Sequence, residues 1–122
     1  MAHQKINFQG WNSALSRTLK PALPGTSRTF IARQVKRGKA LAGVIGNTAI
    51  VLRFESSELV VVAAAGQGLL KAAETIISYA RENGCGSIRF HTQRKGLIRH
   101  LKKYPFVLVD DTHGEWVYRM TL

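Results

Sequence analysis

The stretch ELVVVAAAGQGLLKAAETIISYARENG, residues 58–84, decides the fold class. Its first part, residues 59–65, is continuously apolar and rich in valine, which predicts a central strand covered on both faces. From Leu69 onward, apolar residues recur at the spacing of an amphipathic helix, and Asn83-Gly84 form a typical helix stop. Gly66-Gln67-Gly68 must therefore connect a strand tightly to a helix.

Strand-like runs flank this stretch on both sides. Two of them precede it, ALAGVI (40–45) and AIVLRF (49–54), and short turns separate them, which predicts an antiparallel meander. SIRFHT (87–92) follows the helix and alternates as a strand. Because one helix joins strand 58–65 to strand 87–92, we expect a βαβ crossover with these two strands parallel.

The remaining segments complete an α+β domain with a mixed, mostly antiparallel sheet. We expect a helix at 11–19, a loop at 20–28, a helix at 28–37, a short basic helix at 94–104, and a hairpin made by 106–111 and 115–122. A chain of 122 residues is long enough for one core and too short for two, so a single domain spanning 1–122 is predicted.

Charge is the outlying feature of the composition. The chain holds 18 basic and 7 acidic residues, a formal net charge of +11, and its first 54 residues contain no acid. Such a surface predicts a polyanionic partner, either nucleic acid or an acidic protein face, although a solvated outer face is the alternative. The candidate contact residues are Arg33, Lys36, Arg37, Lys39, Arg94, Lys95, Arg99, Lys102 and Lys103.

Composition also limits the class of protein. No apolar run approaches the ~20 residues of a membrane span, and the N-terminus lacks the apolar core of a secretory signal. The single cysteine, Cys85, excludes an internal disulfide framework. His91, His100 and His113 lack the paired spacing of metal ligands, so no metal is expected. These features predict a cytoplasmic protein that is not secreted.

The glycine turn at residues 66–68 has the parts of an anion site. A helix N-terminus carries unpaired N–H groups and a partial positive charge, and glycines let a phosphate approach the backbone. The turn lacks the third glycine of a dinucleotide fingerprint and the Gly-Lys-Ser/Thr of a P-loop. A plain strand-to-helix corner therefore stays as the structural alternative.

Residues 58–122 resemble the C-terminal half of the GNAT acyl-CoA N-acetyltransferase superfamily. The matching text is residues 58–84, then SIRFHT, GLIRHLKKYPF and VLVDDTHGEWVYRM. The resemblance implies a GNAT-like sheet, acetyl-CoA as cofactor, its pyrophosphate at the glycine turn, and its pantetheine arm beside the splayed strand. The implied cofactor contacts are Val62, Ala63, Ala65, Gly66, Gln67, Gly68 and Leu69.

The chain departs from the family pattern at its polar positions. The family has Gln or Arg at the head of the glycine motif, where this chain has Ala63 or, in a shifted register, Ala65. The position of the family's acidic tyrosine falls on Leu101, with Tyr104 three residues later. Glu58 is the one nearby carboxylate. Glu58 and Tyr104 are therefore the catalytic candidates that the sequence offers.

Two functions follow from these matches and departures. The favoured one is a non-catalytic binding or assembly protein with a degenerate GNAT fold. The C-terminal pattern also resembles small acetyltransferase-like proteins encoded among the structural genes of tailed phages, which implies a virion-associated role and location. The alternative is an acetyl-CoA-dependent N-acetyltransferase that acts on an amine.

Overall fold

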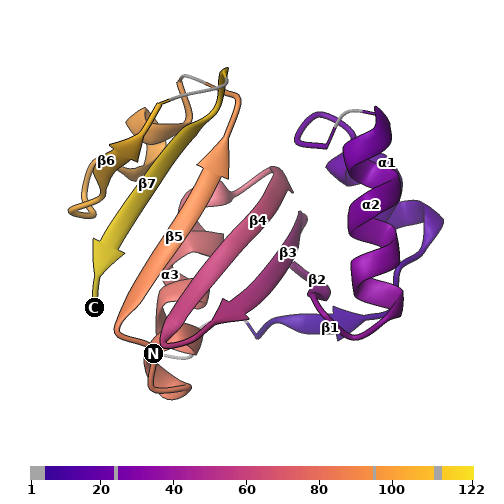
Figure 1. The fold of residues 1–122 in the computed structure, drawn as a ribbon, viewed down its shortest axis with the longest axis horizontal. Coiled ribbons are helices and arrows are strands. Elements are labelled where there is room, and N and C mark those ends of the chain that lie inside the picture. Colours follow the sequence, from indigo (N-terminus) through magenta and orange to yellow (C-terminus); the bar gives the residue numbers. More distant parts are fainter. Residues whose placement is uncertain (1–4, 24, 95, 112–113) are drawn as a thin grey trace.

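A computed structural model describes residues 5–23, 25–94, 96–111 and 114–122 as a mixed sheet with helices on both faces (Figure 1). In chain order the elements are β1 (Asn7–Gln9), α1 (Ser13–Leu19), α2 (Gly25–Lys36), β2 (Leu41–Ile45), β3 (Thr48–Glu55), β4 (Glu58–Gly66), α3 (Leu69–Glu82), β5 (Ser87–Thr92), the 3-10 helix η1 (Leu97–Leu101), β6 (Val107–Asp110) and β7 (Trp116–Thr121). The predicted α+β class is confirmed.

The sheet has seven strands in the order β1-β2-β3-β4-β5-β7-β6. All neighbours are antiparallel except β4 and β5, which run parallel and are joined through α3. The predicted meander, βαβ crossover and C-terminal hairpin are therefore confirmed. The hairpin returns so that β7 lies against β5 and leaves β6 at the edge.

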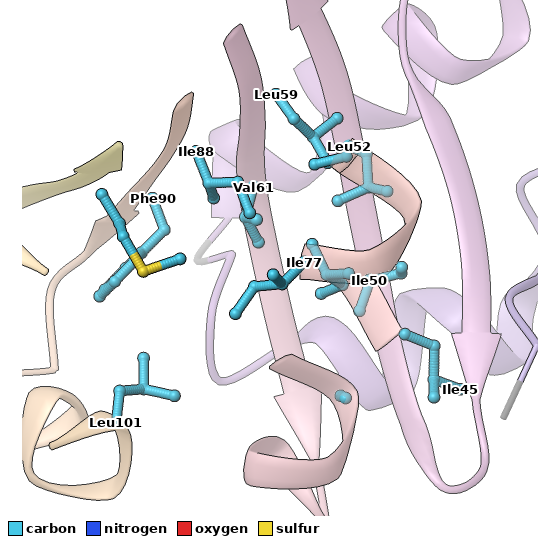
Figure 2. Close-up of a cluster of buried hydrophobic side chains, with 13 residues drawn as sticks. Ile45, Ile50, Leu52, Leu59, Val61, Ile77, Ile88, Phe90 and Leu101 are labelled. Carbon is cyan, nitrogen blue, oxygen red and sulfur yellow. The ribbon is translucent and has the colours of Figure 1, made fainter. Parts of the chain in front are cut away.

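The central position of β4 explains its unbroken apolar sequence. Helix α3 packs behind β4 and β5, while α1 packs on the opposite face of β3 and β4 (Figure 1). Each helix covers its own buried cluster, so β4 needs apolar residues on both faces. The α3 cluster is shown in Figure 2 and includes Ile50, Leu52, Leu59, Val61, Ile77 and Phe90. The α1 cluster includes Leu15, Leu19, Ile31, Val51, Ala63 and Ala65.

A bulge in β4 changes which of its residues face α3 and which face α1. Val51 pairs with Ala63 but the next residue, Leu52, pairs with Val61, so Val62 has no partner in the β3 ladder. An extra residue in one strand shifts the alternation by one position. As a result Val61 belongs to the α3 cluster, whereas Ala63 belongs to the α1 cluster.

One element of the N-terminal segment was not predicted, and the start of another was predicted wrongly. The three-residue strand β1 was not expected; it forms because Asn7, Phe8 and Gln9 pair with the edge of β2, a tertiary contact that leaves no periodic pattern. Helix α2 begins at Gly25 rather than at 28, inside the predicted loop. Thr26 and Ser27 suit a first helical turn as well as a loop, so composition alone did not separate the two states.

The predicted basic helix at 94–104 is also wrong in its bounds and its type, since among the described residues of this range only Leu97–Leu101 is helical, with 3-10 geometry. The hydroxyl of Thr92 accepts the backbone N–H of Arg94 at 2.9 Å and holds the chain in a turn there. Pro105 disfavours helical geometry in the residue before it. Between these two points the described residues form one short 3-10 helix.

Candidate functional site

The site begins where β4 and β5 separate. Their parallel ladder runs from Glu58 paired with Ser87 to Val61 paired with Phe90 and then stops. Both strands continue beyond that point, β4 to Gly66 and β5 to Thr92, and they diverge in Figure 1. The separation leaves a gap in the middle of the sheet, with the backbone edge of β4 unpaired on its β5 side.

On the α3 side, the gap opens into an apolar cleft. This α3-side cleft has a cavity volume of about 80 Å³, and its walls come from β4, α3, β5 and η1. Its lining includes Val62, Ala64, Leu69, Ala73, Phe90 and Leu97. An apolar slot that ends at a glycine turn suits a ligand with a slim, uncharged arm and a charged end.

Backbone geometry requires glycine at both positions of the turn, Gly66 and Gly68. A Cβ on Gly66 would lie 2.2 Å from the carbonyl oxygen of Asn47, and the φ of Gly66 is 131°. Gly68 caps α3 in the left-handed region with φ 83°, where side chains are strained. The hydroxyl of Thr48 donates to the carbonyl oxygen of Gln67, which lies between the two glycines, and so ties the turn to β3.

The same turn leaves a group of backbone donors without acceptors. The first bond of α3 runs from the N–H of Ala72 to the carbonyl of Gly68 at 3.0 Å. In the described part of the chain, the N–H groups of residues 67–71 have no acceptor, and the first turn of α3 contains no acid. These donors and the helix dipole together fit a phosphate group.

The predicted cofactor contacts divide into two sets. Val62, Ala63 and Leu69 line the α3-side cleft, and residues 66–68 form the turn at its end. Ala65 is only 1% exposed and packs in the α1 cluster, away from the cleft. The side chain of Ala63 is packed in that cluster too, so neither alanine has room for a long polar side chain.

Arg94 reaches into the gap from the loop after β5. Its Nη2 donates to the carbonyl oxygen of Ala64 at 2.8 Å, and Arg94 also lines the α3-side cleft. The N–H and C=O of one strand residue point to the same side, so the N–H of Ala64 faces the gap as well. Sequence patterns did not identify Arg94 as part of this cleft.

A second cleft opens on the other side of the sheet, below α2. This α2-side cleft has a cavity volume of about 530 Å³. Apolar side chains of Leu23, Phe30 and Ile31 face Val60 and Val62 of β4 across it. Ala22, Val62, His91, Thr92 and Gln93 line both clefts, so the two meet at the gap between β4 and β5.

A hydrogen-bonded chain of polar groups ends in the α2-side cleft. Arg89 donates from Nε to Nε2 of His91 at 3.0 Å, so that nitrogen carries no proton. Nδ1 of His91 then carries the proton and donates to Oε1 of Glu115 at 2.9 Å. The other nitrogens of Arg89 donate to Glu58 at 2.7 Å and Glu55 at 2.8 Å.

The His91–Glu115 pair was missed in the sequence, although the strand register holds a signal for it. His91 pairs with Val117 across the antiparallel β5 and β7 strands. Glu115 lies two residues before Val117, at the diagonal position on the same face. Recognising the pair from sequence required the register of β7, which its residues alone did not specify.

Solved structures of acetyltransferases share this architecture. An acetyltransferase from Bacillus subtilis in complex with CoA has a TM-score of 0.73 at 15% identity, covering 98% of this chain and 99% of that one. Tetrahymena GCN5 has a TM-score of 0.71 at 10% identity, covering 96% and 95%. A PaiA N-acetyltransferase from Thermoplasma acidophilum in complex with coenzyme A has a TM-score of 0.64 at 10% identity, covering all of both chains. The chain has the GNAT fold. No protein-family model and no curated protein sequence matches it.

Within the GNAT fold, the two predicted catalytic candidates lie outside both clefts. Burial raises the pKa of Glu58, but hydrogen bonds from Arg119 and Ser87 and the charges of Arg119 and Arg89 outweigh it, so the pKa lies below its usual value. Glu58 is therefore an ion-paired carboxylate. The hydroxyl of Tyr104 is buried without a hydrogen-bond partner among the described residues, and its ring contacts that of Phe106.

The predicted polyanion contacts lie on two separate parts of the GNAT fold. Arg33, Lys36, Arg37 and Lys39 are exposed at and beyond the end of α2, whereas the second group surrounds η1 near the other edge of the sheet (Figure 1). In that second group Arg99 and Lys102 are exposed, whereas Arg94 bonds to Ala64. Lys103 donates a hydrogen bond to Glu74 at 2.6 Å, and this bond raises the pKa of Lys103. Lys95 lies outside the described residues.

Neither a metal centre nor a membrane-crossing helix is found in the described part of the chain. Among those residues, no three His, Cys, Asp or Glu side chains lie near enough to hold one ion. None of the described helices is both long and apolar enough to cross a bilayer. His113 lies outside the described residues.

Proposed function

We propose that the chain binds acetyl-CoA in the α3-side cleft and transfers the acetyl group to an amine that enters from the α2-side cleft. The observation that carries this proposal is the meeting of the two clefts where the β4–β5 ladder ends, after Val61 and Phe90. A reaction between two substrates needs them to approach from different directions and meet at one point.

The residues of the α3-side cleft fit the cofactor. The unpaired N–H groups of residues 67–71 would hold the diphosphate, and the N–H and C=O of Ala64 would pair with the amides of the pantetheine arm. The thioester of the bound cofactor supplies an activated acetyl group. B. subtilis and T. acidophilum proteins with this fold were crystallised with CoA, which supports the same choice of ligand.

A non-catalytic binding or assembly protein is the competing function that the sequence favoured. It draws support from Glu58, whose oxygens are occupied by Arg89, Arg119 and Ser87, and from Tyr104, which lies outside the clefts. Such a protein would keep the cofactor cleft as a remnant or as a binding site without turnover.

Calorimetry with acetyl-CoA tests the proposal directly. We expect stoichiometric binding with micromolar affinity, followed by release of free thiol when a primary amine is added. Gln67→Glu places a carboxylate in the turn and should weaken binding at least fivefold, whereas Gln34→Glu makes the same change on α2 and should not. No heat at millimolar acetyl-CoA would overturn the proposal. Binding without thiol release would favour the non-catalytic function.

A polyanion partner is a second candidate, on a separate observation. The basic residues at the end of α2, namely Arg33, Lys36, Arg37 and Lys39, are exposed and form no ion pair with a described carboxylate. Affinity for duplex DNA should then fall steeply between ~50 and 200 mM salt. The double change Lys36→Glu and Arg37→Glu should reduce the slope, whereas Lys20→Glu should reduce it less. Undetectable binding at low salt would exclude this partner.

A further inference from the structure

The α2-side cleft contains one described carboxylate, that of Glu115. Glu115 comes immediately before β7, and its side chain is 42% exposed. Oε1 accepts a hydrogen bond from the Nδ1–H of His91, while Oε2 has no hydrogen-bond partner among the described residues. A carboxylate with one oxygen anchored and the other facing a cleft can receive a cationic donor.

Glu115 is held in place because each residue in the chain of hydrogen bonds that leads to it is itself bonded to the next. Arg89 is held by Glu58 and Glu55, and it donates its third N–H to His91. His91 therefore stays in the tautomer that points a proton at Glu115. Nε2 of His91 is occupied by Arg89, so His91 has no free lone pair to accept a proton from a substrate.

We infer that Glu115 binds the ammonium group of the acceptor and takes its proton, and that His91 is a positioning residue for Glu115. The inference rests on the proposed function and names the base and the acceptor class for it. We assign the base to Glu115 and not to Glu58, the candidate from the sequence, because Glu58 lies on β4 but lines neither cleft.

The lining of the α2-side cleft identifies the kind of acceptor. The lining mixes two kinds of uncharged side chain: Leu23, Phe30, Ile31, Val60 and Val62 are apolar, whereas Thr26, Ser27, Thr92 and Gln93 are polar. Because the carboxylate of Glu115 is bonded to His91, which lines both clefts, the cleft suits a primary amine carried on a small uncharged group.

The proton balance of the reaction is complete with these groups. An ammonium ion gives one proton to Glu115, which passes it to water, and the free amine attacks the thioester carbon. The C–N bond forms as the C–S bond breaks. The second proton of the nitrogen ends on the departing CoA thiolate. Acetyl-CoA and the amine are the only reactants required.

The charges around Glu115 set it apart from the other carboxylates near the cleft. Arg53 from β3 lines the cleft, and Arg89 from β5 lies behind His91. The nearby carboxylates Glu55 and Glu58 are paired with arginines. The α2 residues that line the cleft carry no charge. Among the described carboxylates around the cleft, Glu115 is therefore the one that no arginine occupies.

Kinetics with benzylamine as the acceptor test the assignment. Glu115→Gln should lower kcat/KM about 100-fold, while acetyl-CoA affinity stays within twofold. Glu82→Gln removes the same charge at the exposed end of α3 and should change kcat/KM by less than twofold. His91→Ala should lower kcat/KM about tenfold, and His91→Asn should recover part of it because its amide can donate to Glu115.

A binding measurement tests Glu115 independently of turnover. In NMR titrations, benzylamine should shift the side-chain signals of Glu115 and His91, whereas the uncharged benzyl alcohol should not. Equal benzylamine affinity for the wild type and Glu115→Gln, or an unchanged kcat/KM in that variant, would overturn the inference. If the wild type binds no acetyl-CoA, the proposed function and the proton transfer both fail, while the titration still decides whether Glu115 binds the amine.

Discussion

Arg94 and Ala64 are joined across the gap between β4 and β5 by a hydrogen bond of 2.8 Å from Nη2 to the carbonyl oxygen. The strand ladder stops before this point, at Val61 and Phe90, so this carbonyl has no strand partner on that side. The Arg94 side chain thus makes the hydrogen bond that a neighbouring strand would make to this carbonyl in a continuous sheet. A side chain can move aside for a ligand, whereas a ladder cannot do so without unfolding the sheet.

Replacing Arg94 by alanine should strengthen acetyl-CoA binding. In the proposed complex the pantetheine arm would use the β4 edge that Arg94 occupies, so removing the guanidinium would spare the ligand a competing bond. A bond of this kind is worth about 1 kcal/mol net, which corresponds to roughly fivefold in affinity. Calorimetry and stopped-flow association rates measure the effect. Arg99→Ala is the matched control, because Arg99 is exposed and outside the cleft. Weaker binding by Arg94→Ala would instead show that the guanidinium holds a cofactor phosphate.

The elements with strong internal patterns were predictable from sequence, and those that depend on a partner were not. The apolar run of β4 and the helical spacing of α3 each arise from local burial, so residues 58–84 specified the crossover. Strand β1 forms because β2 offers it an edge, and η1 is limited by the Thr92 turn and Pro105. Neither constraint produces a periodic pattern in its own segment.

The same distinction applies to the candidate site. The glycine turn at 66–68 is contiguous in sequence and was located from it. Glu115, His91 and Arg94 come from segments whose relative positions depend on the β5–β7 register and on the gap in the sheet. Three residues brought together by non-local pairing leave no spacing that a single sequence can reveal.

Gly66→Ala should destabilise the protein strongly. The added Cβ would lie 2.2 Å from the carbonyl oxygen of Asn47, which is backbone and cannot rotate away, and the residue has a φ of 131°. We expect a loss of at least about 3 kcal/mol in the free energy of unfolding, measured by urea denaturation. Gly96→Ala is the control, since its Cβ would meet nothing within 4 Å. Equal stability of the two variants would contradict the close backbone approach at Gly66.

Glu58→Gln should destabilise the protein at neutral pH but not in acid. Burial raises the pKa of Glu58, yet its bonds to Arg119 and Ser87 and the nearby arginine charges lower it overall. A lowered folded-state pKa means that the carboxylate stabilises the fold above its unfolded pKa of about 4.3 and loses this effect as pH falls through the folded value. Because the side chain is only 13% exposed, we expect a loss of about 2 kcal/mol at pH 7.

Urea denaturation at several pH values checks this dependence. The difference between the wild type and Glu58→Gln should shrink steadily below about pH 4. Glu82→Gln, on the exposed end of α3, should show a difference near zero throughout. A penalty for Glu58→Gln that is the same at pH 7 and pH 3 would mean that the charge of Glu58 contributes nothing to the fold.

Ala65→Gln, which restores the polar residue of the GNAT pattern, should cost stability without improving cofactor binding. Ala65 is 1% exposed and lies in the same buried cluster as Leu15 and Leu19 of α1, on the face opposite the α3-side cleft. A glutamine there is too large for the site and buries an amide, and together these effects cost about 3 kcal/mol. Ala14→Gln on the exposed side of α1 should change stability by less than about 0.5 kcal/mol. Tighter acetyl-CoA binding by Ala65→Gln would show that the new side chain reaches the cofactor, and would contradict the packing of β4 against α1 as the reason for alanine.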